Sequence, residues 1–321
     1  MEVIRLRFPF NVASNEYPPL AMALGYFDGV HRGHQQVVLE AKKQAEEKGI
    51  CSAVMTFDPH PSVVLGKTNK QIQYISPLAD KIKSIEELGI DYLFIIHFSV
   101  EFANLLPQEF IDQYVIGLNV KHVVAGFDFT YGRMGKGTME TLPFHSRDKF
   151  SYSVVPKFTE GDEKVSSTRI RLLIKDGRTN ELYSLLGRYY TTSGIVIHGD
   201  KRGRTIGFPT ANVDLKDEYI IPPVGVYAVR MKVHSQWYNG VCNIGYKPTF
   251  NKESILPSVE VHIFDFNEDI YGEEVTIEWR LHLRNEQKFS GIEELVAQIE
   301  RDKQNSLKYF RNLDNLPNSS L

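Results

Sequence analysis

The sequence predicts a two-part chain: an α/β half built on a parallel sheet, then a smaller antiparallel β half that ends in a helix. From residue 20 to about residue 187, short β-rich runs alternate with helical patterns, which is typical of a parallel α/β sheet. After Gly187 the hydrophobic period changes from helical to twofold. A chain of 321 residues also exceeds the usual size of one domain. We therefore expect domains at 1–186 and 187–321.

Strands and helices alternate through the first half. We expect strands at 20–27, 50–57, 91–98 and 121–127, and helices at 33–49, 76–89, 107–118, 167–177 and 180–187. In the first helix Val37, Val38, Ala41 and Ala45 share one face, and Gly49 ends it. This order of elements predicts that neighbouring strands pair in parallel.

The second half contains short strands between Gly, Pro and Asn residues. Four of them are expected at 225–233, 237–244, 258–266 and 275–283. Apolar and polar residues alternate strictly in the last strand, as in a half-buried strand. These strands predict a small antiparallel barrel or sandwich. Residues 290–310 return to a helical pattern and are expected to pack on it.

The composition is that of an ordinary globular enzyme. The net charge is −3, which gives no overall basic surface for nucleic acid. Cys51 and Cys242 lie far apart without a CxxC motif, so we expect reduced thiols. The N-terminus lacks the apolar core of a signal peptide, and the apolar runs are too short to span a bilayer. We expect a soluble, cytoplasmic protein with no membrane partner.

The stretch LGYFDGVHRGH, residues 24–34, predicts an anion site. A strand end, a glycine-rich turn and a helix start bring backbone N–H groups and the positive end of a helix dipole to one place. His31 and His34 are three residues apart at the helix start and share one face. The turn residues expected to line this anion site are Gly25, Phe27, Asp28 and Gly29.

Two alternatives to an anion site remain open for this stretch. Zinc needs further ligands, and His60 could be a third, but no cysteine or HExxH pattern supports a metal. The other alternative is a surface turn with two incidental histidines.

The segment VSSTRIR, residues 165–171, also lies at a predicted strand-to-helix junction. Ser167 and Thr168 can cap the helix while contacting phosphate oxygens, and Arg169 and Arg171 can neutralise phosphate charge. The alternative is a plain helix cap with solvated arginines.

Together these motifs resemble those of the nucleotidyltransferase superfamily. With TFDPHP (56–61) and GFDFTYG (126–132), they resemble more narrowly the adenylyltransferase module of bacterial bifunctional riboflavin kinase/FAD synthetase. The resemblance implies a Rossmann-like nucleotidyltransferase α/β domain that adenylylates FMN with ATP, giving FAD and pyrophosphate. It also implies that His60 and Asp128 help to hold the acceptor or the metal-nucleotide. The usual ISSTxxR motif has Val165 in place of Ile here, a conservative change.

The chemistry of such a transfer assigns roles to the residues. A phosphate oxygen of the acceptor attacks the α-phosphate of ATP and pyrophosphate leaves, so donors placed in advance around the phosphorus are the main catalytic resource. His31 and His34 suit the α-phosphate and its developing charge. Arg171, with Ser167 and Thr168, suits the β- and γ-phosphates.

In the second half, SGIVIHGDKRGRTIGFPTAN, residues 193–212, is the main motif. Gly199, Gly203 and Gly207 leave room for phosphates to approach backbone N–H groups, although the spacing does not form a Walker A loop. A tight hairpin loop is the alternative. Thr210 and Asn212, on alternate positions of an extended segment, offer two neutral oxygens to Mg²⁺. The other nucleotide-binding residues expected here are Lys201, Arg204 and Pro209.

Glu260 lies between Val259 and Val261 and therefore faces the other side of its strand. A lone strand glutamate is commonly a solvated residue. However, GFPTAN, GVYAVR, NIGYKPTF, VEVHIFDF, DIYG and the C-terminal LRNEQKFSGIEEL together resemble the riboflavin kinase module. The resemblance implies a small antiparallel β-barrel riboflavin kinase domain with a C-terminal helix. It implies Glu260 as the base for the ribityl 5′-hydroxyl, and Thr210 and Asn212 as holders of Mg²⁺-ATP.

The expected enzyme thus converts riboflavin to FMN and FMN to FAD, with ATP as co-substrate, Mg²⁺ as cofactor and no nucleic-acid partner. Two rival hypotheses remain. One keeps the kinase and gives the first half another phosphorylated acceptor; the other is a flavin-binding regulator without turnover. The presence of His31, His34, Thr210, Asn212 and Glu260 counts against the regulator, because a pure binder does not need them all.

Overall fold

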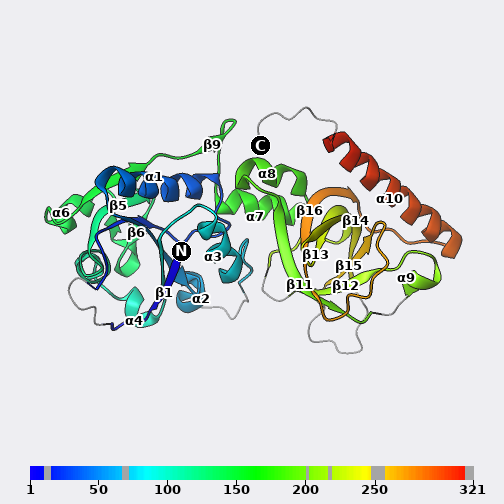
Figure 1. Cartoon of the computed structure of the whole chain (residues 1–321), viewed down its shortest axis with the longest axis horizontal. Helices are drawn as coiled ribbons and strands as arrows, with labels where there is room; N and C mark the ends of the chain where they lie inside the picture. Colours follow the sequence, from blue (N-terminus) through cyan, green and yellow to red (C-terminus); the bar gives the residue numbers. More distant parts are fainter. Residues whose placement is uncertain (11–15, 67–71, 200–201, 216–218, 247–256, 315–321) are drawn as a thin grey trace. The chain divides into compact units, whose positions relative to one another are not determined.

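The chain divides into two compact units, Met1–Ser167 and Thr168–Leu321, and each is described by itself. The computed structural model (Figure 1) describes all residues except 11–15, 67–71, 200–201, 216–218, 247–256 and 315–321. The two cysteines, Cys51 and Cys242, are free thiols, and burial raises the pKa of Cys242.

The first unit is built on a six-stranded sheet in the order β1-β4-β3-β2-β5-β8, with every pair parallel. The strands are β1 (Glu2–Leu6), β2 (Leu20–Leu24), β3 (Cys51–Asp58), β4 (Tyr92–His97), β5 (Val120–Gly126) and β8 (Ser151–Val155). The four predicted strands are confirmed. Edge strands β1 and β8 were not predicted, because their mixed polar and apolar residues resemble loop segments.

Helices and short hairpins connect and cover these strands. The helical segments are α1 (Arg32–Lys48), α2 (Pro61–Leu65), α3 (Leu78–Glu86), α4 (Val100–Ala103), α5 (Pro107–Phe110), a π-helical turn (Ile111–Ile116), a 3₁₀ turn (Arg133–Gly135) and α6 (Leu142–Ser146). The small hairpins are β6 (Thr130–Tyr131) with β7 (Gly137–Thr138), and β9 (Thr159–Glu160) with β10 (Glu163–Lys164).

Helix α1 confirms the sequence pattern closely. Its buried residues are Val37, Val38, Ala41 and Ala45, and Gly49 ends it in the left-handed conformation. Helix α1 packs on β2, β3 and β5, which are interior strands of the sheet. Strand β2 is buried on both faces, as expected for the centre of a parallel sheet.

The second unit is a closed barrel in the order β11-β12-β15-β14-β13-β16. The strands are β11 (Tyr190–Ile197), β12 (Ala211–Leu215), β13 (Gly225–Val233), β14 (Gln236–Tyr246), β15 (Pro257–Ile263) and β16 (Glu274–Arg284). The helical segments are α7 (Ser167–Lys175), a 3₁₀ turn (Thr179–Glu181), α8 (Leu182–Leu186), α9 (Arg202–Thr205) and α10 (Ile292–Asp314). Because β16 pairs with both β11 and β13, the sheet closes on itself and is a barrel rather than a sandwich.

The predicted strict alternation in 275–283 holds only as far as Trp279. Trp279 lies opposite Val229 while Leu281 lies opposite Ala228, so Arg280 is the extra residue of a β-bulge. Arg280 is consequently buried. Its guanidinium carbon lies 3.2 Å from the centre of the Tyr189 ring.

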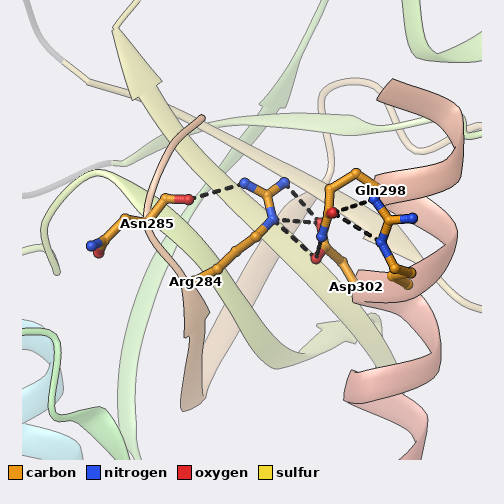
Figure 2. A network of polar contacts seen from close by, with 5 residues as sticks. Arg284, Asn285, Gln298 and Asp302 are labelled. Carbon is orange, nitrogen blue, oxygen red and sulfur yellow. Dashed lines mark hydrogen bonds and ion pairs between the residues drawn. The ribbon is translucent and has the colours of Figure 1, made fainter. Parts of the chain in front are cut away.

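A network of polar contacts fixes α10 on the barrel (Figure 2). Arg284 Nε donates to both carboxylate oxygens of Asp302 at 3.0 Å, and Nη2 donates to Oδ2 at 2.8 Å. Gln298 adds a 2.8 Å hydrogen bond to Asp302 Oδ1. Asp302 is 3% exposed, so this paired charge holds the helix at a buried point. The prediction that the last helix packs on the β domain is confirmed.

Candidate functional site

The first candidate site lies where the strand order of the parallel sheet reverses. From β2 the chain proceeds outward to β3 and β4 and then returns to β5 on the other side, and ligands of such sheets bind beyond the strand ends at this point. A cavity of about 510 Å³ lies there. Its wall includes residues 24–27 at the end of β2, and Gly126 and Asp128 at the end of β5.

His31 and His34 form a stacked pair at the start of α1. Their ring centroids are 3.5 Å apart, and the His31 Nδ1 atom accepts a 3.2 Å hydrogen bond from the backbone N–H of His34, which caps the helix. A neutral His31 ring that accepts at Nδ1 carries its proton on Nε2. The predicted shared face of the two histidines is confirmed.

His34 is placed to act as a neutral hydrogen-bonding group. Burial, followed by the charges of His31, Lys81 and Lys164, holds its pKa well below the usual value of 6.5. Its Nδ1 atom is buried and has no hydrogen-bond partner within the part of the chain that the structure describes. The ring lines the cavity and packs edge-on against Phe27. A ligand group can therefore satisfy this nitrogen.

The turn between β2 and α1 leaves no space for larger residues at its glycines. A Cβ atom at Gly25 would lie 2.6 Å from the Phe27 ring, and one at Gly29 would lie 2.8 Å from Ile75. Gly29 also has φ = +82°, and Phe27 has φ = +56°. Phe27 and Gly25 line the cavity, so the strained turn brings backbone to the cavity wall.

Asp28 and Ser167 tie the turn to other elements. The buried Asp28 carboxylate accepts hydrogen bonds from the backbone N–H groups of Ile75 and Ser76, which precede α3. Ser167 Oγ donates to the Asp28 carbonyl oxygen at 3.0 Å. Ser167 of the VSSTRIR segment is thus in direct contact with the turn that follows β2. Thr168, Arg169 and Arg171 lie on α7 in the second unit, and their roles stay predictions.

His60 caps α2, since its Nδ1 accepts from the backbone N–H of Ser62 at 3.0 Å. Its ring packs edge-on against Tyr26, with centroids 4.4 Å apart. Among the described residues, no three His, Cys, Asp or Glu side chains are grouped to hold a metal ion. The geometry therefore gives no support to the zinc alternative.

Asp128 lines the cavity and forms a 2.6 Å ion pair with Lys164 Nζ. Lys164 also lies 4.6 Å from the centre of the Phe127 ring. Sequence reasoning missed this lysine, although it directly precedes the VSSTRIR motif. A basic residue next to a phosphate motif is the signal that could have found it.

Aromatic residues form the apolar part of the cavity. Phe57, Phe129 and Tyr131 line it, together with Phe98 and Phe102. Phe57 and Tyr131 also belong to the hydrophobic core, which is why periodicity alone does not separate core from binding residues. The combination of an apolar wall with a few polar groups is typical of a small-molecule site.

The second candidate site lies in the barrel unit, in a cavity of about 410 Å³. Three predicted residues line it, Arg204, Pro209 and Thr210, together with residues 266–271. His262 Nδ1 forms a 2.8 Å hydrogen bond with the Pro209 carbonyl oxygen and so fixes the backbone next to Thr210. None of residues 266–271 was predicted to line this site, although DIYG (269–272) is one of the motifs that resemble the riboflavin kinase module.

Asn212 and Glu260 are direct cross-strand neighbours on β12 and β15. Residues opposite each other in an antiparallel pair project to the same side, so the two functional groups share one face, opposite Val259 and Val261. Asn212 is 8% exposed. Neither residue is among those that line the 410 Å³ cavity.

Two glycines of the motif at residues 193–212 have other residues packed directly against them. A Cβ atom at Gly199 would lie 2.2 Å from the Asn212 side-chain nitrogen, and one at Gly203 would lie 2.3 Å from the Phe208 carbonyl oxygen. Gly207 has φ = +87°. Instead of a simple hairpin loop, this segment contains the short helix α9. Lys201 lies outside the described residues.

Comparison with known proteins identifies a family for each part of the chain. The family model of FAD synthetase matches residues 13–169, and that of riboflavin kinase matches residues 186–310. Two curated relatives are described as bifunctional riboflavin kinase/FMN adenylyltransferase. The Bacillus subtilis (strain 168) protein is 55% identical over 98% of this chain and 99% of its own length. The Listeria monocytogenes protein is 47% identical over 98% of this chain and its full length.

A solved structure from Streptococcus pneumoniae, described as a macrolide-efflux protein, has a TM-score of 0.88 and 35% identity, covering 95% of this chain and 99% of that one. None of the helices described here is long and apolar enough to cross a membrane. The sequence relatives and both family models name flavin enzymes. The chain therefore belongs to the family of bifunctional riboflavin kinases/FMN adenylyltransferases, with an FAD synthetase part followed by a riboflavin kinase part.

Proposed function

We propose that the aromatic cavity of the first unit binds the flavin ring of FMN, and that the stacked histidines face the α-phosphate of ATP. The observation that carries this proposal is the buried Nδ1 of His34, which has no hydrogen-bond partner among the described residues and lies in the wall of a mostly apolar cavity at the N-terminus of α1. Helix N-termini favour phosphate groups. Family membership gives the reaction: FMN and ATP yield FAD and pyrophosphate.

In this reaction a phosphate oxygen of FMN attacks the α-phosphorus of ATP, and the bond to pyrophosphate breaks. The imidazoles of His31 and His34 donate hydrogen bonds to the charge that develops on the α-phosphate oxygens. Ser167 and Thr168 with Arg169 and Arg171 hold the departing β- and γ-phosphates. Because the helix cap and the stacking of the rings fix the two histidines before the substrates arrive, little reorganisation of these two donors is required during the transfer.

In the barrel unit, we assign Glu260 as the base that accepts the proton of the ribityl 5′-hydroxyl of riboflavin. That oxygen then attacks the γ-phosphorus of ATP, giving FMN and ADP. Thr210 and Asn212 supply neutral oxygen ligands that suit Mg²⁺, and the carboxylate opposite Asn212 adds negative charge nearby. Mg²⁺, when bound, neutralises phosphate charge during the transfer. Arg204 and Pro209 line the cavity next to Thr210 and are assigned to ATP, as are Lys201 and the three glycines.

Two finer assignments complete the proposal. The functional domains divide at 186/187, which agrees with the start of the riboflavin kinase match at residue 186, although the compact units divide inside α7. The enzyme works in the cytoplasm, where ATP is supplied and where free thiols such as Cys51 and Cys242 persist.

Chromatography of the flavins tests both activities directly. The purified chain is incubated with ATP and Mg²⁺, and with either riboflavin or FMN as the starting flavin. We expect riboflavin to pass through FMN to FAD, with pyrophosphate release in the second step. Accumulation of FMN without FAD would contradict the assignment of the first site, and an unchanged flavin would contradict both.

A further inference from the structure

Lys81 is a buried lysine beneath the first site that no sequence motif marks. It lies on α3 and is 2% exposed, whereas Lys83 on the same helix is exposed. A lysine is almost never fully buried unless its charge is paired or hydrogen-bonded. Its position therefore requires an explanation.

The Lys81 ammonium group joins the ends of two central strands. Nζ donates to the Tyr26 carbonyl oxygen at 2.9 Å and lies 3.4 Å from Thr56 Oγ1. Thr56, fully buried near the end of β3, also donates to the Tyr26 carbonyl at 2.8 Å. The ammonium further lies 4.0 Å from the centre of the Tyr26 ring, a cation–π contact. One peptide group of the turn after β2 thus receives two hydrogen bonds.

This peptide group belongs to the wall of the cavity. Tyr26 and its neighbours Gly25 and Phe27 line the cavity, and the Tyr26 ring contacts the ring of His60. Phe27 in turn packs against His34. A change at Lys81 would therefore reach the groups that face the substrates without Lys81 contacting them itself.

The charge of Lys81 also acts on the site. Asp28 and Asp58 are the carboxylates whose charges favour its protonated form, and Lys81 in turn lowers the pKa of His34. Burial outweighs the two carboxylates and lowers the pKa of Lys81 to about 8. The remaining groups around the ammonium are the Tyr26 ring and carbonyl and the Thr56 hydroxyl.

We propose that Lys81 is a positioning residue for adenylyl transfer: it fixes the Tyr26 peptide in the cavity wall and places a buried positive charge beneath the phosphate site. This inference depends on the proposed placement of FMN and ATP in the first unit. The positive charge favours the negative charge that gathers at the α-phosphate in the transition state.

The test compares Lys81→Met with Lys83→Met in the full-length chain. Methionine retains most of the side-chain volume but removes the charge and the donor. We expect kcat for FAD formation from FMN to fall about tenfold to hundredfold in Lys81→Met, less than the largest losses caused by removing a direct donor to the developing charge. KM for FMN and ATP should change much less, because the interaction acts in the transition state. Riboflavin phosphorylation in the same preparation should stay unchanged and reports that the second unit is folded.

The pH dependence of kcat for FAD formation separates the effect of the Lys81 charge from that of its hydrogen bond to the Tyr26 carbonyl. Neutral Lys81 can still donate to the Tyr26 carbonyl, so deprotonation removes only the charge. In the unmutated chain we expect kcat for FAD formation to fall as the pH rises through about 8, and this decline should be absent in Lys81→Met. Unfolding does not explain such a decline, because a lysine whose pKa is lowered in the folded state destabilises the fold less as it deprotonates.

The outcomes are distinct. If the unmutated chain forms no FAD, the proposed function of the first site fails and the inference fails with it. If it forms FAD and Lys81→Met matches Lys83→Met in kcat, only the role of Lys81 is overturned. If the melting curve shows that Lys81→Met does not fold, the pH profile of kcat in the unmutated chain tests the proposal instead. A kcat for FAD formation that stays constant through about pH 8 then overturns it.

Discussion

The two units build their sites from strands in different ways. Strand β2 is buried along its whole length, so its side chains serve the core, and the ligand groups come from the turn that follows it. Strand β12 carries Asn212, the proposed Mg²⁺ ligand, within the strand, opposite Glu260 on β15. When both faces of a parallel sheet are covered, ligands bind at the ends of its strands. In a barrel, side chains along one face of a strand can also contact a ligand.

This difference has a consequence for how the sites are held. In the first unit, a strained turn, a helix cap and the hydrogen bond from Ser167 to Asp28 fix the groups. In the second, strand register places Asn212 beside Glu260. Substitutions that separate the two activities test whether the sites are independent.

The largest expected effect is on FAD formation in His34→Ala. Loss of a preorganised donor at the developing charge costs about 100-fold or more in kcat, while FMN formation should stay near normal because the kinase residues lie in the other unit. Lys43→Ala, on the exposed face of the same helix, is the control and should retain both activities. Parallel loss of both activities in His34→Ala would show that the units are coupled.

The second effect concerns the kinase. We expect Asn212→Ala to reduce the rate of FMN formation at least as much as Glu260→Gln, because phosphoryl transfer depends more on positioning and charge neutralisation than on the base. FAD formation from FMN should be spared in both. Asp214→Ala, an exposed position on the same strand, is the matched control. A normal kinase rate in Asn212→Ala would refute its assignment as a metal ligand.

The third effect is on stability. Asp302→Ala leaves the Arg284 guanidinium without its carboxylate partner at a buried point, which costs about 3 kcal/mol or more of unfolding free energy. Thermal unfolding followed by circular dichroism should show a lower transition temperature for the barrel unit. Glu300→Ala, at an exposed position of the same helix, should leave the transition nearly unchanged. If Asp302→Ala and Glu300→Ala behaved alike, the contact in Figure 2 would not stabilise the helix.

The smallest effect is predicted for the ion pair at the mouth of the first cavity. The side chains of Asp128 and Lys164 are 59% and 41% exposed, so Asp128→Asn should change the unfolding free energy by less than about 1 kcal/mol. Thermal unfolding again provides the measurement. A loss comparable to that of Asp302→Ala would show that this pair stabilises the first unit as strongly as the buried pair stabilises the second.

Much of the fold was predictable because strong hydrophobic patterns mark the central elements. The buried face of α1 and the strands β2 to β5 are where the sequence places them. The edge strands β1 and β8 were missed because one-sided or exposed strands carry mixed residues. The bulge at Arg280 was missed because residues 275–283 alternate between apolar and polar without interruption. The sequence therefore gives no sign of the extra residue.

The local chemistry of the sites follows from the sequence alone: two histidines at a helix start, hydroxyls and arginines at a second junction, and Thr210, Asn212 and Glu260 on extended segments. Residue types and short spacings determine it, since helix and strand periods are local properties. Only the tertiary structure decided which distant residues meet. Lys81 reaches Tyr26 across 55 positions, and Asp128 pairs with Lys164 across 36. Such contacts depend on strand order and side-chain packing, which no local pattern contains.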